Sequence, residues 1–432
     1  MASVMTAEPR FTWLRASRSD LKLISLCALA YFLDLSGLAV GNTFSAVFFT
    51  AGGAFDSAGL GALLGSAFAG AALGVPLLGW LAARRGCRFA MVVAASILAL
   101  SSLAEAASPD ITTLTLFRFV SGSALGALPP LLFAYLANKI PSGRRGAAAM
   151  SVSVIGLAAV PATVFLVRWL TSVQPMGIDG WRWTLALNAL GATACASLFY
   201  FVHEPPEVGE ESTVFAGRAA ALFHDRANRR SLIILLLLSL LTPWAILGFP
   251  LTGGAVLVAK GFDVANSLLY LGVSFLGPII GNSVVAALAD RFARKSILVA
   301  CVLAMALLGP LFAVLSDLLA LMAVGTLFTT AAAIYVPLFL LYAAETFPAV
   351  NRAQANALGW ALNRGTAAVV PLVFVPLLKG GHLAEMFAAM SLTLLAIGGI
   401  LITRSRMAGE PTVPGYKFQD RDRGLIPANK SD

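Results

Sequence analysis

Charged side chains are scarce in this sequence. Asp, Glu, Lys and Arg make up 12% of the 432 residues, about half the share in an average soluble domain. Hydrophobic residues reach 59%, and the mean hydropathy is +0.85. These values exclude an ordinary soluble domain and indicate an integral membrane protein. The net charge of +9 then reflects where a membrane protein keeps its Lys and Arg, and no nucleic-acid partner is predicted.

Residues that build disulfides, metal sites and catalytic sites are also few. Four cysteines lie in three apolar runs and one loop, at Cys27, Cys195, Cys301 and Cys87. They predict no disulfide framework, and the three histidines have no Cys or carboxylate at metal-ligand spacing. Nucleophile-elbow and phosphate-loop motifs are absent. We therefore predict neither an enzyme nor a bound metal or cofactor.

Long hydrophobic runs, by contrast, occupy most of the chain. A transmembrane helix needs roughly 20 apolar residues. Twelve runs of spanning length occur, at 21–43, 58–82, 89–107, 111–137, 147–171, 181–202, 232–257, 265–288, 296–315, 318–343, 353–378 and 383–403. Such continuous runs are unlike the short alternating strands of a membrane β-barrel. We predict an all-α membrane protein with twelve transmembrane helices.

The second half of the chain repeats the first. Pro130 and Arg145 of the segment 118–146 recur as Pro337 and Arg352, and in both cases the numbers differ by 207. A fixed offset over a long stretch indicates duplication, so the twelve helices should form two six-helix pseudo-repeats.

The predicted parts of the chain follow from this division. They are a tail at 1–20, a bundle at 21–202, a polar linker at 203–231, a bundle at 232–403 and a tail at 404–432. The linker is either a short interfacial helix or a solvated connection. No cleavage pattern follows the first basic residues, so the first run is predicted to be an uncleaved anchor.

Basic residues predict the orientation. They gather in the two tails and in the loops that lie on the same side as the tails. The opposite loops hold only Arg168, Arg182, Lys260 and Lys379. The excess of Lys and Arg marks the cytoplasmic side, so both termini are predicted to be cytoplasmic in a plasma (inner) membrane protein.

Three ionisable residues lie deep within the predicted spans, where a charge costs roughly 2.5–3.5 kcal/mol and usually faces a cavity. They are Asp34, Arg118 and Arg364. Counted along their helices, Asp34 and Arg118 lie at one level of the membrane. We therefore predict that they pair, and that protonation of Asp34 couples protons to a structural change. The alternative is a permanent structural ion pair.

Arg364 lies near the midplane without an obvious partner. Its guanidinium offers the two-point geometry that fits a carboxylate, so we expect it to bind substrate together with Asn363. Aromatic residues at comparable depth, Tyr31, Trp244 and Tyr335, are candidates for the same site. There are two alternatives. Arg364 pairs with Glu345 or with a helix C-terminus and serves closure alone, and the aromatic residues only pack.

Further motifs resemble those of a known transporter family. They are the loop GWLAARRGCR at 79–88, its second copy ALADRFARK at 287–295, and RFVSGSALG at 118–126. With twelve spans in two halves, they resemble the major facilitator superfamily. AETFPAVNRA at 344–353, GWRW at 180–183 and HEPPE at 203–207 are similar to the branch of sugar porters, aromatic-acid:proton symporters and organic-ion transporters.

The resemblance implies alternating access by rocking of the two bundles around a central site. It also implies proton coupling through Asp34 and Arg118, and substrate binding by Arg364. The family's motifs imply a cytoplasmic gate made of Arg84, Arg85, Arg144, Arg145, Asp290, Arg291, Glu345 and Arg352. Ala83 and Asn138 stand where the motifs have acids. Closure is therefore expected to depend on the acids of the second half.

From these observations we predict a monomeric secondary active transporter that moves a small organic acid, such as an aromatic one, together with protons across the lipid bilayer. Alternatives of the same fold are a sugar or polyol symporter and a drug exporter. The seventh span has no Gln or Asn to hold a neutral sugar, which disfavours the sugar porter. A non-transporting membrane receptor would need a signalling domain, and the tail at 404–432 is short and polar.

Overall fold

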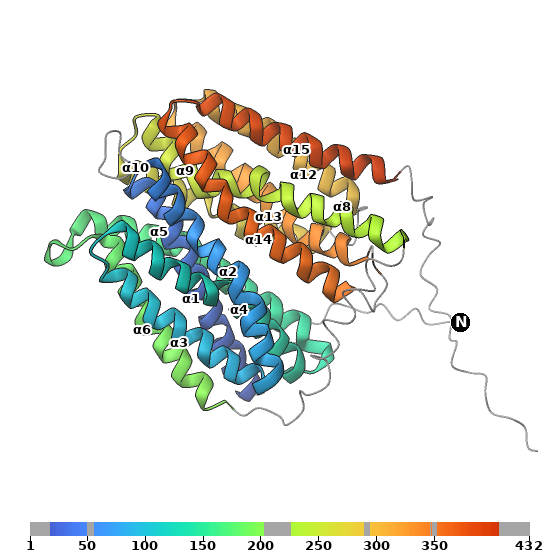
Figure 1. The fold of residues 1–432 in the computed structure, drawn as a ribbon. Coiled ribbons are helices and arrows are strands. Elements are labelled where there is room, and N and C mark those ends of the chain that lie inside the picture. Colours follow the sequence, from blue (N-terminus) through green and yellow to red (C-terminus); the bar gives the residue numbers. More distant parts are fainter. Residues whose placement is uncertain are drawn as a thin grey trace, which may run out of the picture.

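The computed structural model describes residues 18–49, 56–202, 226–288, 294–345, 347 and 352–405, and every regular element among them is a helix (Figure 1). The first half contains α1 (Arg18–Val47), α2 (Ser57–Arg85), α3 (Cys87–Ala106), α4 (Ile111–Lys139), α5 (Ser142–Val173), the short η2 (Pro175–Gly177) and α6 (Gly180–Tyr200). The second half contains α8 (Arg226–Thr242), η3 (Pro243–Leu247), α9 (Gly248–Ala259), α10 (Val264–Ser274), α11 (Gly277–Leu288), α12 (Arg294–Val314), α13 (Leu318–Glu345), α14 (Arg352–Lys379) and α15 (Leu383–Ser405).

The predicted fold class is confirmed. Eleven stretches of the described chain are long and apolar enough to cross a membrane; α8, η3 and α9 join into one of them, and α10 with much of α11 forms another. The remaining helix, α6, has 21 residues, which span about 31 Å. Several boundaries differ from the prediction. α8 begins at Arg226 rather than at 232, α5 begins at Ser142 rather than at 147, and α1 ends at Val47 rather than at 43. Cys87 is the first residue of α3 rather than a loop residue.

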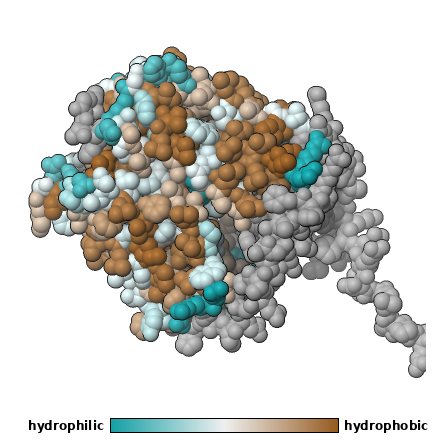
Figure 2. Space-filling model, in the orientation of Figure 1, coloured by the Kyte–Doolittle hydropathy of each residue, from teal (hydrophilic) through white to brown (hydrophobic). Residues whose placement is uncertain are grey.

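One cluster of buried apolar residues lies within the first half. A second cluster runs through the second half and includes first-half residues such as Phe44, Leu60 and Trp181. The two bundles lie side by side in Figure 1. Large side chains on the outer surface remain exposed, for example Leu100 at 71% and Leu307 at 74%. Figure 2 shows such hydrophobic side chains over both bundles. In water this surface would be costly, and in a bilayer it faces hydrocarbon.

Aspartates cap helices at duplicated positions. Their carboxylates accept hydrogen bonds from backbone N–H groups three residues on, at 2.7–2.9 Å. These bonds satisfy donors that the first turn of a helix leaves free. The capping residues are Asp56, Asp110, Asp263 and Asp317. Asp263 and Asp317 follow Asp56 and Asp110 by 207 positions each, so the duplication extends to the caps. These four caps define what we call the far side, opposite the side where α1 begins and α15 ends.

Two of the four far-side basic residues, Arg182 and Lys260, cap the C-terminal ends of helices. Arg182 Nη1 donates to two carbonyls at the end of α3, both at 2.8 Å. Lys260 Nζ donates to two carbonyls at the end of α12, both at 2.7 Å. A cation there also suits the helix dipole, and burial lowers the pKa of Lys260. The acceptors are Ala106 with Ser108, and Ala313 with Leu315.

The bundles meet closely on the far side. A Cβ at Gly65 of α2 would meet the Ala368 carbonyl of α14, and one at Gly254 of α9 would lie 2.7 Å from Ser45 Oγ of α1. Arg168 of α5 donates to the carbonyl of Ala265 in α10 at 3.0 Å. The described contacts of these three helix pairs therefore close the far half of the interface.

Candidate substrate cavity and buried charges

A cavity of about 120 Å³ opens in the second bundle. It is lined by α8, η3, α13 and α14, and its polar lining consists of Ser239, Thr242, Asn363 and Arg364. Pro243 starts the π-helical turn η3 in this wall. Proline cannot donate the regular helical hydrogen bond, and single π turns in helices are common at functional sites. The local sequence thus interrupts the seventh span where the cavity lies.

Arg364 is the cation of this cavity. Its guanidinium carbon lies 4.2 Å from the ring centre of Trp360 and 5.8 Å from that of Phe68. Phe68 belongs to α2, so Arg364 reaches across to the first bundle. Its Nε is buried without a hydrogen-bond partner in the described structure. An arginine between two rings with a free donor is suited to receive an anion.

Asp34 is fully buried on α1, and both of its carboxylate oxygens lack hydrogen-bond partners among the described residues. The opposite charge that acts on it is Arg364 of the other bundle, although no ion pair joins the two in the part of the chain that the structure describes. The same electrostatic neighbourhood includes Tyr31. A buried acid and a buried cation therefore face the bundle interface from opposite sides.

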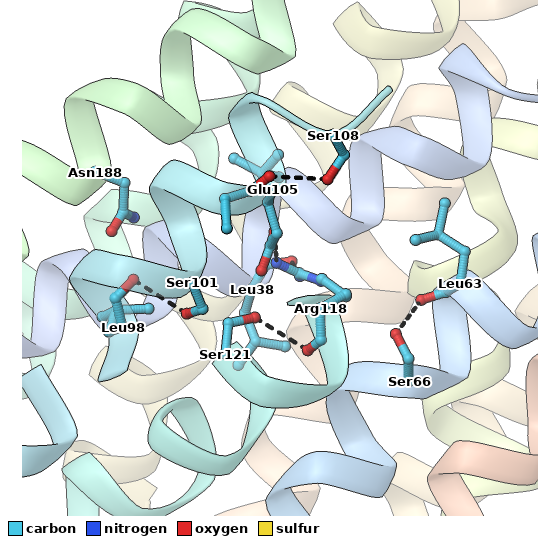
Figure 3. A network of polar contacts seen from close by, with 12 residues as sticks. Leu38, Leu63, Ser66, Leu98, Ser101, Glu105, Ser108, Arg118, Ser121 and Asn188 are labelled. Atoms are coloured by element: carbon cyan, nitrogen blue, oxygen red, sulfur yellow. Dashed lines mark hydrogen bonds and ion pairs between the residues drawn. The ribbon is translucent and has the colours of Figure 1, made fainter. Parts of the chain in front are cut away.

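The predicted Asp34–Arg118 ion pair is wrong in this structure. Arg118 Nη1 instead lies 3.3 Å from Glu105 Oε2, with both side chains buried (Figure 3). Arg118 Nη2 donates to the carbonyl of Leu38, one turn beyond Asp34, at 3.4 Å. Counting residues gives the depth of a side chain along its helix, but it does not specify which way that side chain points around the helix axis.

Glu105 is a buried charge that the sequence prediction missed. It lies in the last turn of α3, so the run 89–107 made it look like a residue at the membrane edge. Its side chain is nevertheless 0% exposed. The sequence carries no clear signal for this burial, because the Arg182 hydrogen bonds that cap this end of α3 are seen only in the structure.

Of the predicted substrate residues, Arg364 and Asn363 line the cavity. Asn363 Nδ2 donates to the carbonyl of Ser239 across the wall at 3.2 Å. Tyr31, Trp244 and Tyr335 are not among the lining residues. Their rings pack on Phe133, Phe374 and Phe339 respectively. The prediction missed Trp360 and Phe339, which supply aromatic surface to the cavity itself.

Part of the predicted gate lies within the described residues. Arg144 Nη1 forms an ion pair with Asp20 Oδ2 at 3.0 Å, within the first bundle. Arg145 Nε donates to the Ile140 carbonyl at 2.8 Å. Exposed Arg84 and Arg85 lie over the rings of Trp80 and Phe89. Asp290 and Arg291, and the side chains of Glu345 and Arg352, lie outside the described residues.

Comparisons with known proteins agree with this architecture. The family model described as Major Facilitator Superfamily matches residues 24–371. YyaJ of Bacillus subtilis, a proposed metabolite transport protein, is 24% identical over 398 residues, which cover 83% of this chain and 86% of YyaJ. The gentisate transporter of Corynebacterium glutamicum is 27% identical over 346 residues, which cover 76% and 74%.

Other similar proteins differ in what they are named for. They include a niacin transporter of Acinetobacter baylyi, an arabinose-proton symporter of Bacillus subtilis and multidrug resistance proteins of Mycobacterium tuberculosis. Among solved structures, a D-xylose-proton symporter superposes with a TM-score of 0.72 at 19% identity, covering 89% of this chain and 97% of the symporter. At that identity the likeness concerns the fold alone.

Proposed function

This chain belongs to the major facilitator superfamily, and within that family of transporters we propose that it is a proton-coupled symporter of a small organic acid. The single observation that carries the proposal is Arg364, a cation that lines the cavity with a buried donor left unpaired in the described structure. A substrate carboxylate would satisfy that donor and supply the missing counter-charge. The guanidinium of arginine can bind a carboxylate through two parallel N–H···O hydrogen bonds.

Aromatic surface around Arg364 favours an aromatic acid. Trp360 and Phe339 line the cavity, and Phe68 faces Arg364 from the first bundle. Such walls suit a flat ring held by stacking, with its carboxylate on the guanidinium. Two relatives are named for gentisate and niacin, which are aromatic carboxylic acids. The relatives named for sugars match over shorter stretches. Asn363 is the one side-chain amide in the lining, too few for a polyhydroxyl ligand.

Proton coupling in this proposal depends on Asp34 rather than on an Asp34–Arg118 pair. Arg364 is the cation whose charge acts on the buried Asp34. When a substrate carboxylate neutralises Arg364, Asp34 loses that compensation, and a buried carboxylate without hydrogen bonds is costly. Proton binding to Asp34 removes the cost. Anion and proton would thus enter the transport cycle together, through opposite sides of the bundle interface.

The proposal also covers the oligomeric state, the membrane and the orientation of the protein. We propose a monomer in the plasma membrane with both termini in the cytoplasm, so that the closed far side faces outward and the cavity is reached from the cytoplasm. Closure on the cytoplasmic side would use the candidate gate residues, among them Arg84 and Arg144. The Arg144–Asp20 pair would then have to exchange partners as the bundles rock.

Paired measurements of binding and uptake on Arg364 variants test the substrate class. We expect Arg364→Ala to weaken gentisate and nicotinate binding by about ten- to a hundredfold or more, since charge-assisted hydrogen bonds contribute about 1.5–3 kcal/mol. Arg364→Lys should retain the preference for anions with lower affinity, because lysine keeps the charge and loses the fork. The matched control is Arg229→Ala, which removes an exposed arginine at the start of α8.

Calorimetric titration of the purified protein gives the affinities, and vesicle uptake gives transport. Wild-type carboxylate affinity in Arg364→Ala would exclude the acid-binding role. Binding of D-xylose, with no binding of either acid to the wild type, would favour the sugar symporter instead.

A further inference from the structure

The Glu105–Arg118 pair is a second buried ionic site, distinct from the cavity. Glu105 Oε2 faces Arg118 Nη1 at 3.3 Å, whereas Glu105 Oε1 is buried and has no partner in the described structure. Figure 3 shows the carboxylate of α3 and the guanidinium of α4 pointing toward one another. A half-satisfied carboxylate inside a membrane bundle is expensive.

The second half of the chain has apolar residues in place of this pair. The residues 207 positions further on are Phe312 and Gly325. Phe312 is fully buried, and its ring centre lies 4.7 Å from that of Phe249 and 5.4 Å from that of Tyr270. The same place in the duplicated fold is thus filled by close apolar packing. Since apolar replacements of buried ion pairs are often neutral or stabilising, packing does not account for the charges in the first half.

Arg118 connects this pair to α1. Besides contacting Glu105, it donates to the Leu38 carbonyl at 3.4 Å. It also fills the space beside Gly41, where a Cβ would collide with the guanidinium. Further along the same helix, Ser45 contacts Gly254 of the second bundle. The ion pair therefore holds the part of α1 that closes the far side.

We propose that Glu105 is a second proton-binding site of the protein, and that its protonation loosens the hold of Arg118 on α1. The proton adds to the Glu105 carboxylate and forms a neutral acid. The pair changes from zero net charge to one positive charge, and the ion pair becomes a weaker contact between a cation and a neutral group. Arg118 is then free to leave Leu38. This site is independent of which substrate the cavity accepts.

Among the described residues, few other charges face Glu105. From α4 it faces Arg118 and the hydroxyl of Ser121. From α6, Arg182 binds the carbonyl of the adjacent Ala106 and is itself paired with Asp179 at 3.6 Å. The ionisable side chains of α2 are Arg84 and Arg85 at its other end, and α1 carries Asp34 a turn before Leu38. Arg118 is therefore the charge that would most affect protonation of the Glu105 carboxylate.

Infrared titration of the purified full-length protein in lipid vesicles tests the assignment. The C=O stretching band of protonated carboxylic acids is recorded as the pH is lowered, for wild type, Glu105→Gln and Asp34→Asn. We expect Glu105→Gln to lose one titrating component that Asp34→Asn retains. An unchanged spectrum in Glu105→Gln would overturn the proposal, because Glu105 would then be a permanently ionised structural residue.

A second readout follows α1 directly. In an Asp34→Asn background, which removes the other proton-binding carboxylate, Ser45→Cys labelled from the far side by a maleimide should react faster as the pH falls, and Glu105→Gln should abolish that pH dependence. A pH dependence that persists in Glu105→Gln would also refute the mechanism. If Glu105→Gln does not fold, the double variant Glu105→Gln/Arg118→Leu leaves no unpaired cation and takes its place in the infrared titration. Neither measurement requires a bound substrate, so a failure of this proposal can be told apart from a failure of the substrate role proposed for Arg364.

Discussion

Gly65 allows the sharpest test of how the two bundles close. It lies in α2 where that helix meets α14, and a Cβ at this position would collide with the backbone carbonyl of Ala368. A backbone atom cannot turn aside as a flexible side chain can. Gly65→Ala should therefore push α2 and α14 apart on the far side, and it should favour the state of the transport cycle in which this side is open.

The magnitude follows from the cost of overpacking. One added methyl group in a tight contact typically costs about 1–3 kcal/mol. If the cost applies to the closed state alone, the ratio of open to closed protein rises by about five- to 150-fold. A protein that is mostly closed on the far side would then spend a measurable share of its time open.

Two alanine variants on the same helix serve as controls. A Cβ at Gly79 would have open space around it, with no neighbouring atom within 4 Å, so Gly79→Ala should change nothing. Gly74 approaches the backbone of Ser123 in α4, within the first bundle. Gly74→Ala should thus lower the melting temperature without opening the far side, because both helices belong to the same bundle.

Labelling of a buried reporter measures the opening. Ser45 is 0% exposed and lies against Gly254, so Ser45→Cys reacts with a maleimide only when the far side opens. We expect Gly65→Ala to raise the labelling rate by about five- to 150-fold, in line with the population shift. Equal rates in the Gly65→Ala and Gly79→Ala backgrounds, with both proteins folded, would refute the reasoning.

Two further predictions concern coupling and orientation. Asp34→Asn should abolish uphill accumulation driven by a pH gradient while substrate exchange continues, since the neutral amide mimics the protonated acid; accumulation equal to wild type in vesicles would remove Asp34 from coupling. Met176→Cys, 87% exposed on the far side, should react with a membrane-impermeant maleimide in intact cells, whereas Gly146→Cys, near the start of α5 on the opposite side, should react only after permeabilisation. The reverse pattern would show that the termini lie outside.

The sequence alone predicted the spans and most of their limits to within a few residues, but not the breaks at η3 and between α10 and α11. The run predicted at 111–137 is α4 at Ile111–Lys139, and the run at 383–403 is α15 at Leu383–Ser405. In a membrane every backbone polar group has to be satisfied within its own segment, so a long apolar run has little choice but to form a helix. The duplication was equally visible, and the paired caps at Asp110 and Asp317 are its structural counterpart.

Only the tertiary structure decided how the buried charges face one another. Residue counting puts Asp34 and Arg118 at one depth, yet Arg118 pairs with Glu105, and the charge that acts on Asp34 is Arg364 from the other bundle. Depth follows from counting residues along one helix. Pairing depends on the rotation of each helix about its axis and on which neighbours it packs against, and these are set by contacts between segments far apart in the chain.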